Sequence, residues 1–203
     1  KYVILGVTGP NEYENNVNNN WYTNYSAQWC MSYAADQLAA LRLSSPKDAT
    51  RVEQKTNFQN EELAQWKETA ENMYLPKDDT LNVVLQQDGF LDKELVKAAD
   101  LNPAERPINQ HWSWDRILRS PYIKQADVLQ GMYLFEDKFD EATLRRNYTF
   151  YEPFTVHESS LSPCVHSIIA SKLGEDEAAY AFYLQTARLD LDDYNAEVEE
   201  GLH

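Results

Sequence analysis

The stretch that decides the fold class is residues 22–46, YTNYSAQWCMSYAADQLAALRLSSP. Its apolar residues recur at steps of three and four, the spacing that places side chains on one face of an α-helix. They are Tyr22, Tyr25, Trp29, Cys30, Tyr33, Ala34, Leu38 and Leu41. Ser44, Ser45 and Pro46 end the run. The pattern therefore predicts a long helix that faces the core.

The residues around this helix continue the helical pattern. A second, more polar helix with a thin apolar stripe is predicted over 49–74. Residues 75–107 are expected to be mostly connection, with a brief extended stretch within 82–90. Helical spacing returns near Ile117 and again over 126–132.

Clear boundary signals mark the rest of the chain. Pro121 separates the two short helical pieces before it and after it, because proline disfavours helix in the residue before it. Ser162 is expected to cap a helix that ends at Gly174. Another helix is predicted over 175–189. The chain is therefore expected to be a single all-α unit, residues 1–203, of helical hairpins whose long loops carry polar and aromatic residues.

Composition excludes several kinds of partner. The 203 residues have a formal net charge of -15 and no Lys/Arg cluster, so we expect no nucleic acid and no anionic membrane as partner. Cys30 and Cys164 form neither a disulfide framework nor a metal-ligand spacing. With no apolar run near the ~18 residues that a membrane span needs, and no signal peptide, a cytoplasmic location is expected. The chain has no initial Met and ends abruptly, which favours a fragment of a longer protein.

The loop before the first helix, VTGPNEYENNVNNNWYTN at residues 7–24, is unusually rich in polar and aromatic residues. Gly9 and Pro10 favour a turn that presents Glu12, and asparagines offer both donors and acceptors to sugar hydroxyls. Aromatic faces such as that of Trp21 could lie against a sugar ring. The residues alone leave two interpretations open, a carbohydrate site or a set of asparagine-capped turns. They also leave Glu14 as good a candidate for the active carboxylate as Glu12.

Three long motifs together carry a family resemblance. They are VTGPNEYENNVNNNWYTNYSAQWCMSY at 7–33, INQHWSWDRILRSPYIKQADVLQGMYLF at 108–135 and YEPFTVHESSLSPCVHSIIASKLG at 151–174. This sequence resembles glycoside hydrolase family 65, the inverting disaccharide phosphorylases. The resemblance implies that the chain is the second half of an (α/α)6 barrel catalytic domain, with the flanking domains absent. It also implies a homodimer for the full-length protein.

The resemblance assigns the general acid to the glutamate of a G-P-x-E-Y motif, which falls on Glu12. The acid must be protonated before the reaction, and aromatic surroundings such as Tyr13 or Trp21 would favour that form. Asn11 stands where many members have Asp, and it favours the maltose branch. The implied reaction is phosphorolysis of maltose to β-glucose 1-phosphate and glucose. Phosphate is the co-substrate, and no cofactor or metal is expected.

Alternatives remain within and outside the enzyme class. Another α-glucosyl disaccharide (kojibiose, nigerose or trehalose) could be the substrate, because the loop that selects the acceptor lies outside these residues. The chain could also be a non-catalytic helical module that only binds sugar. In either case the isolated 203 residues are expected to be inactive, since half of the sugar site would be missing.

Two further sites follow from the resemblance. Lys124 and Gln125 match a Lys-Gln pair that contacts sugar hydroxyls, whereas the residues alone favour an exposed lysine at a helix start. His203 is the candidate phosphate ligand. The segment of His157, Ser159 and Ser160 is the other candidate, although a tight helix cap explains it equally well.

The remaining polar and aromatic residues are expected to be structural. His166 lies on an apolar helix and is interpreted as a core histidine. Trp112 and Trp114 are interpreted as packing residues, given the core area that such rings supply. The acidic face of the second predicted helix is expected to be solvated; it comprises Glu61, Glu62, Glu68 and Glu71.

Overall fold

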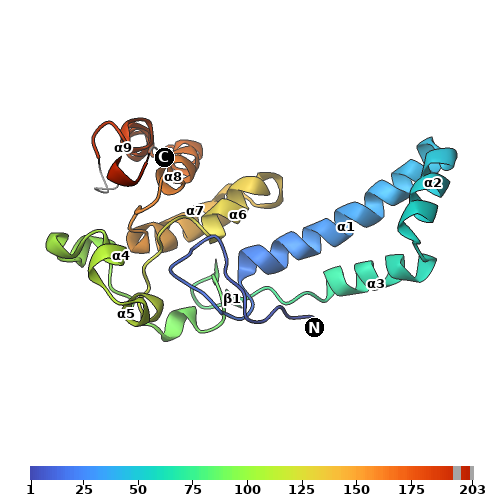
Figure 1. Cartoon of the computed structure of the whole chain (residues 1–203), viewed down its shortest axis with the longest axis horizontal. Coiled ribbons are helices and arrows are strands. Elements are labelled where there is room, and N and C mark those ends of the chain that lie inside the picture. The colour runs from blue at the N-terminus through green and yellow to red at the C-terminus, as the bar shows by residue number, and fades with distance from the viewer. Residues whose placement is uncertain (194–197, 202–203) are drawn as a thin grey trace.

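A computed structural model describes residues 1–193 and 198–201, and Figure 1 shows that it consists mainly of α-helices. In the described part of the chain the sheet content is one antiparallel hairpin, in which β1 (Lys77–Asp78) pairs with β2 (Val83–Val84). The all-α prediction is confirmed, and so is the brief extended stretch within 82–90. Among these residues no helix has the length and apolar character needed to cross a membrane.

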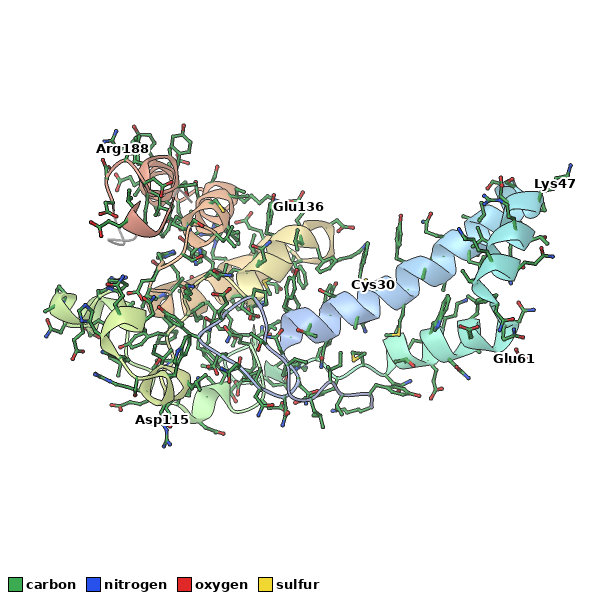
Figure 2. The ribbon with its side chains drawn as sticks, viewed as in Figure 1. Cys30, Lys47, Glu61, Asp115, Glu136 and Arg188 are labelled. Atoms are coloured by element: carbon green, nitrogen blue, oxygen red, sulfur yellow. The ribbon has the colours of Figure 1, made fainter. Side chains whose placement is uncertain are left out.

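Three helices form an arm that extends from the rest of the molecule. In Figure 1, α1 (Trp21–Ser44) runs outward, α2 (Pro46–Thr56) lies at its far end and α3 (Asn60–Glu71) returns beside it. Lys47 and Glu61 stand on the outside of this far end (Figure 2). The prediction that α1 faces the core holds only in part. Trp21 is buried at its start, but Trp29 and Tyr33 are 37% and 49% exposed.

The predicted single helix over 49–74 is wrong, because the structure has two. Asn57 adopts a left-handed conformation, with φ of 53°, and this conformation ends α2. Gln59 and Glu62 then form a capping box that starts α3. The acidic face of α3 is solvated as expected.

Four shorter helices build the centre of the molecule. Pro121 lies between two of them, as predicted. The helix α7 was not predicted from the sequence. The four are α4 (Ile108–His111), α5 (Trp114–Arg119), α6 (Val128–Leu134) and α7 (Glu141–Tyr151).

The last two helices, α8 (Ser162–Lys172) and α9 (Asp176–Arg188), pack against each other as a hairpin. Gly174 has φ of +73° and separates them, so the predicted stop is confirmed. The predicted cap is wrong. Ser162 lies inside the first turn of α8, and its hydroxyl bonds to the imidazole Nδ1 of His157 at 2.8 Å.

Short 3₁₀ turns complete the chain at Phe90–Asp92, Ala98–Asp100, Pro103–Glu105, Glu136–Lys138, Glu152–Phe154 and Val198–Glu200. Two apolar clusters hold the elements together. The larger is centred on Trp21, Phe90 and Leu129, and the smaller contains Tyr13 and Ile108. Because Tyr13 belongs to the smaller cluster, the loop that carries Glu12 is built into the core rather than lying loosely on it.

Candidate active site

The site begins with a tight turn at Asn11–Glu14, closed by a hydrogen bond from the Glu14 N–H to the Asn11 carbonyl at 3.0 Å. Asn11, Tyr13 and Glu14 are at most 5% exposed. The Glu12 side chain, in contrast, is 57% exposed. The turn therefore presents one carboxylate to the outside and buries its neighbours.

Glu14 has a different task from Glu12. Its carboxylate forms a buried ion pair with the ammonium of Lys93. The same ammonium donates to the carbonyls of Leu118 and Ser120, at 3.0 and 2.8 Å. With its charge held in this way, Glu14 anchors the turn instead of facing an open surface.

The start of the turn is fixed by the buried carboxylate of Asp127. It accepts the Asn11 N–H at 3.1 Å and the Asn20 side-chain amide at 3.1 Å. Burial raises the pKa of Asp127 to about 7, because the charged form loses its hydration, and these two donors oppose the rise. Gly9 has no room for a side chain here, since a Cβ would lie 2.3 Å from Asn20 Nδ2.

The structure brings Lys124 and Gln125 directly to this turn. The Lys124 ammonium donates to Glu12 Oε2 at 2.8 Å, and the Lys124 backbone N–H donates to Asn11 Oδ1 at 3.0 Å. The Gln125 amide donates to the Pro10 carbonyl at 2.9 Å. Three of the predicted site residues, Glu12, Lys124 and Gln125, thus form one cluster from two segments more than a hundred positions apart.

A third segment joins the cluster. The Ser159 hydroxyl donates to Gln125 Oε1 at 2.5 Å. The preceding residue, Glu158, is 2% exposed and accepts the Tyr13 hydroxyl at 2.8 Å. Sequence reasoning missed both Glu158 and Asp127. In the sequence each of them is an acidic residue next to an apolar run. This pattern alone does not distinguish a buried carboxylate from one on the surface.

The two histidines near this segment contact each other. His166 is buried, and its ring lies 4.5 Å from that of His157, in an edge-on contact. Burial lowers the pKa of His166 to about 4 and holds the pKa of His157 well below its ordinary value. The prediction of a core histidine at 166 is confirmed. The other phosphate candidate, His203, lies outside the described residues.

The aromatic residues differ from the prediction at two points. Trp112 packs as expected, with the Arg116 guanidinium 3.5 Å from its ring centre. Trp114, however, is 57% exposed and touches the Tyr13 ring edge-on. The two aromatic residues expected beside Glu12 make other contacts. Tyr13 turns inward to Glu158, and Trp21 packs against Tyr25.

No group of three His, Cys, Asp or Glu side chains in residues 1–193 and 198–201 is arranged to hold a metal ion. The chemically distinctive feature is instead an exposed carboxylate beside an ammonium, with amide and hydroxyl groups next to them. Such a group can exchange a proton and bind hydroxyls or an anion.

An all-α chain with such a carboxylate in a G-P-N-E-Y turn is the arrangement that the resemblance to glycoside hydrolase family 65 implies. Residues 1–203 match the glycosyl hydrolase family 65 central catalytic domain over their whole length, and the chain belongs to this family. It is 53% identical over 203 residues to the maltose phosphorylase of Bacillus subtilis (strain 168) and 42% identical to the α,α-trehalose phosphorylase of Thermoanaerobacter brockii. The kojibiose phosphorylase of Halothermothrix orenii is 35% identical.

A solved structure extends the comparison to the fold. The putative kojibiose phosphorylase from human microbiome superposes with a TM-score of 0.88 at 41% identity, covering 100% of this chain and 26% of that one. The chain likewise spans 26% of the length of the three curated relatives. It is therefore the helical counterpart of about a quarter of each relative.

Proposed function

We propose that this chain belongs to a protein of its relatives' length that catalyses the inverting phosphorolysis of an α-glucosyl disaccharide, with maltose as the favoured substrate. The observation that carries the proposal is the exposed carboxylate of Glu12 beside the Lys124 ammonium, on a turn whose other residues are buried. The 53% identity to a maltose phosphorylase and the asparagine at position 11 favour maltose.

In the proposed reaction Glu12 acts as the general acid. Its proton passes to the glycosidic oxygen as the bond between that oxygen and C1 breaks. A phosphate oxygen attacks C1 from the opposite face, so the products from maltose are β-glucose 1-phosphate and glucose. Inverting hydrolases need a second carboxylate to activate water, but phosphate is already a nucleophilic oxyanion. One protein carboxyl is therefore enough.

Lys124 and Gln125 are proposed to bind sugar hydroxyls and to border the phosphate site. The ammonium that holds Glu12 is a cation, so phosphate would compete with Glu12 for it. The contact between Ser159 and Gln125 favours the segment 157–160 as one wall of the phosphate site. His203 remains a second candidate. A cofactor-free enzyme and a homodimer complete the proposal and rest on the resemblance. A cytoplasmic location is proposed from the composition of the chain.

The test uses the full-length protein and measures glucose release from maltose, kojibiose, nigerose and trehalose, with and without phosphate. Glu12→Gln keeps the shape of the side chain but cannot donate the proton. We expect turnover to fall about 10²–10⁴-fold, the usual contribution of a general acid, with KM little changed. Glu68→Gln, on the exposed face of α3, is the matched control.

Each outcome has a distinct meaning. Near wild-type turnover in Glu12→Gln would place the acid elsewhere. Faster phosphorolysis of another disaccharide would change the substrate but keep the chemistry. No phosphate-dependent cleavage of any of the four sugars would favour a module that only binds sugar.

A further inference from the structure

Glu158 is a buried carboxylate that the proposed chemistry does not use. It is 2% exposed and accepts three hydrogen bonds. Oε2 accepts the Tyr13 hydroxyl at 2.8 Å and the Ile108 N–H at 2.9 Å, and Oε1 accepts Arg106 Nε at 3.1 Å. A buried charge is tolerated when such donors compensate its lost hydration, so Glu158 is held in one orientation.

The Tyr13 hydroxyl connects this carboxylate to the candidate acid. Tyr13 directly follows Glu12 in the turn, and its ring is 1% exposed. Its N–H also donates to Asn11 Oδ1 at 3.2 Å. A tyrosine held at its backbone N–H and at its hydroxyl cannot be displaced without breaking a buried hydrogen bond.

Each buried residue of the turn is held by a different part of the chain. Asn11 is held by Asp127, Glu14 by Lys93 and Tyr13 by Glu158. Glu12 is the turn residue left pointing outward. These three anchors fix the backbone from which Glu12 projects, and the Lys124 ammonium contacts its carboxylate. The anchor at Tyr13 acts on the residue that directly follows Glu12.

We propose that Glu158 is a positioning residue for the general acid, which it orients through the Tyr13 hydroxyl. This inference rests on the proposed function of Glu12. A reacting group displaced by about 1 Å loses on the order of 10²-fold in rate, so a small shift of the turn is enough to matter.

The molecule offers a comparison carboxylate for this role. Glu105 accepts hydrogen bonds from Trp112 Nε1 at 3.0 Å and from Arg116 Nη2 at 3.3 Å, so like Glu158 it joins an aromatic residue to an arginine. These two hydrogen-bond partners lie outside the turn that carries Glu12. Glu105→Gln removes a similar charge without touching the acid.

The experiment compares two substrates in the full-length protein, both with phosphate. Maltose needs a proton on its leaving oxygen. The fluoride of α-glucosyl fluoride leaves as an anion when its bond to C1 breaks, so it needs no acid. Any defect that acts through Glu12 should appear with maltose and disappear with the fluoride, whereas general damage to the site affects both.

For Glu158→Gln we expect kcat on maltose to fall about 10–100-fold, because a displacement of the Glu12 carboxyl by up to about 1 Å has an effect of this size. On α-glucosyl fluoride, kcat should stay within about 3-fold of the wild-type value. Tyr13→Phe removes only the hydroxyl and should give the same pattern. The loss in the double variant should be smaller than the product of the two single losses, because Glu158→Gln weakens and Tyr13→Phe removes the same hydrogen bond. Glu105→Gln should match the wild type on both substrates.

Two results would overturn the inference. Equal losses on maltose and on the fluoride would make Glu158 a structural residue, and wild-type kcat on maltose would leave it without a role. If Glu158→Gln does not fold, Tyr13→Phe carries the same comparison. Failure of the proposed function is separate, since it would appear as full maltose activity in Glu12→Gln or as no phosphorolysis by the wild type.

Discussion

Replacing Gly9 with alanine should damage both the stability and the chemistry of the protein. A Cβ at this position would lie 2.3 Å from Asn20 Nδ2 and 2.5 Å from Asp127 Oδ2. Ordinary contacts are about 3.5 Å or longer, so the backbone or these two groups must move by about 1 Å. Asn20 and Asp127 hydrogen-bond to each other, and Asp127 also holds Asn11.

The expected loss of stability in Gly9→Ala has two parts. Overpacking of a tight interior costs about 1–3 kcal/mol. Weakening a hydrogen bond to the buried Asp127 carboxylate adds about 1–3 kcal/mol. We therefore expect Gly9→Ala to lower the free energy of unfolding by roughly 2–6 kcal/mol. Because the turn that carries Glu12 shifts with it, kcat should fall on the order of 10²-fold.

Denaturant unfolding followed by circular dichroism, together with kcat on maltose and phosphate, measures both effects in the full-length protein. Gly174→Ala is the matched control. Its φ of +73° disfavours alanine, at a cost of about 1–2 kcal/mol, but nothing lies within 4 Å of the added Cβ, and Gly174 has no part in the turn that carries Glu12. Unchanged stability and unchanged kcat in Gly9→Ala would refute the close packing described for this turn.

Three other predictions concern the nucleophile, the buried histidine and the isolated chain. Without phosphate the full-length protein should barely hydrolyse maltose, and rapid phosphate-independent release of glucose would point to a hydrolase instead. His166 must stay neutral when folded, because its pKa is lowered to about 4, whereas the unfolded chain takes up a proton below about 6.5. His166 should therefore contribute a fall of roughly 3 kcal/mol in stability as pH drops from about 6.5 to about 4, whereas Asp127, whose pKa is raised to about 7, acts in the opposite direction. His166→Gln keeps a donor for the Ser162 carbonyl and should reduce that fall; an unchanged pH dependence of the urea midpoint would contradict this assignment. The 203 residues alone should be inactive and should associate or bind a hydrophobic dye, since Trp29 and Tyr33 are exposed on the arm. A dye-negative monomer in sedimentation that cleaves maltose with phosphate would disprove this.

The helices were predictable where an apolar stripe is continuous and its ends are marked, as around Gly174. The break after α2 was not, because one asparagine can equally continue a polar helix or end it in a left-handed conformation. The helix α7 was missed for a related reason. It buries a polar residue, Asn147, whose amide oxygen accepts the Val84 N–H at 3.0 Å, so its inner face does not appear apolar in the sequence.

Less of the site could be predicted from the residues alone. Glu12, Lys124 and Gln125 came from the family resemblance, and spacing gave no reason to bring positions 12 and 124 together. The choice between Glu12 and Glu14 depends on which of the two side chains faces the core. Glu14 faces it because Lys93, 79 positions away, pairs with its carboxylate. Glu158 stayed hidden, since its partners lie about 50 and 145 positions away in sequence.

These long separations have a consequence for how the protein folds. The α1–α3 arm and the α8–α9 hairpin join neighbouring segments, so they close short loops. The turn around Glu12 is fixed by contacts that span 79 to 145 positions. Such long-range contacts form slowly, because the chain loses conformational entropy before it gains their interaction energy. A refolding or newly made chain would thus acquire its helices first and orient its acid last, so regained helicity is a poor measure of a finished site.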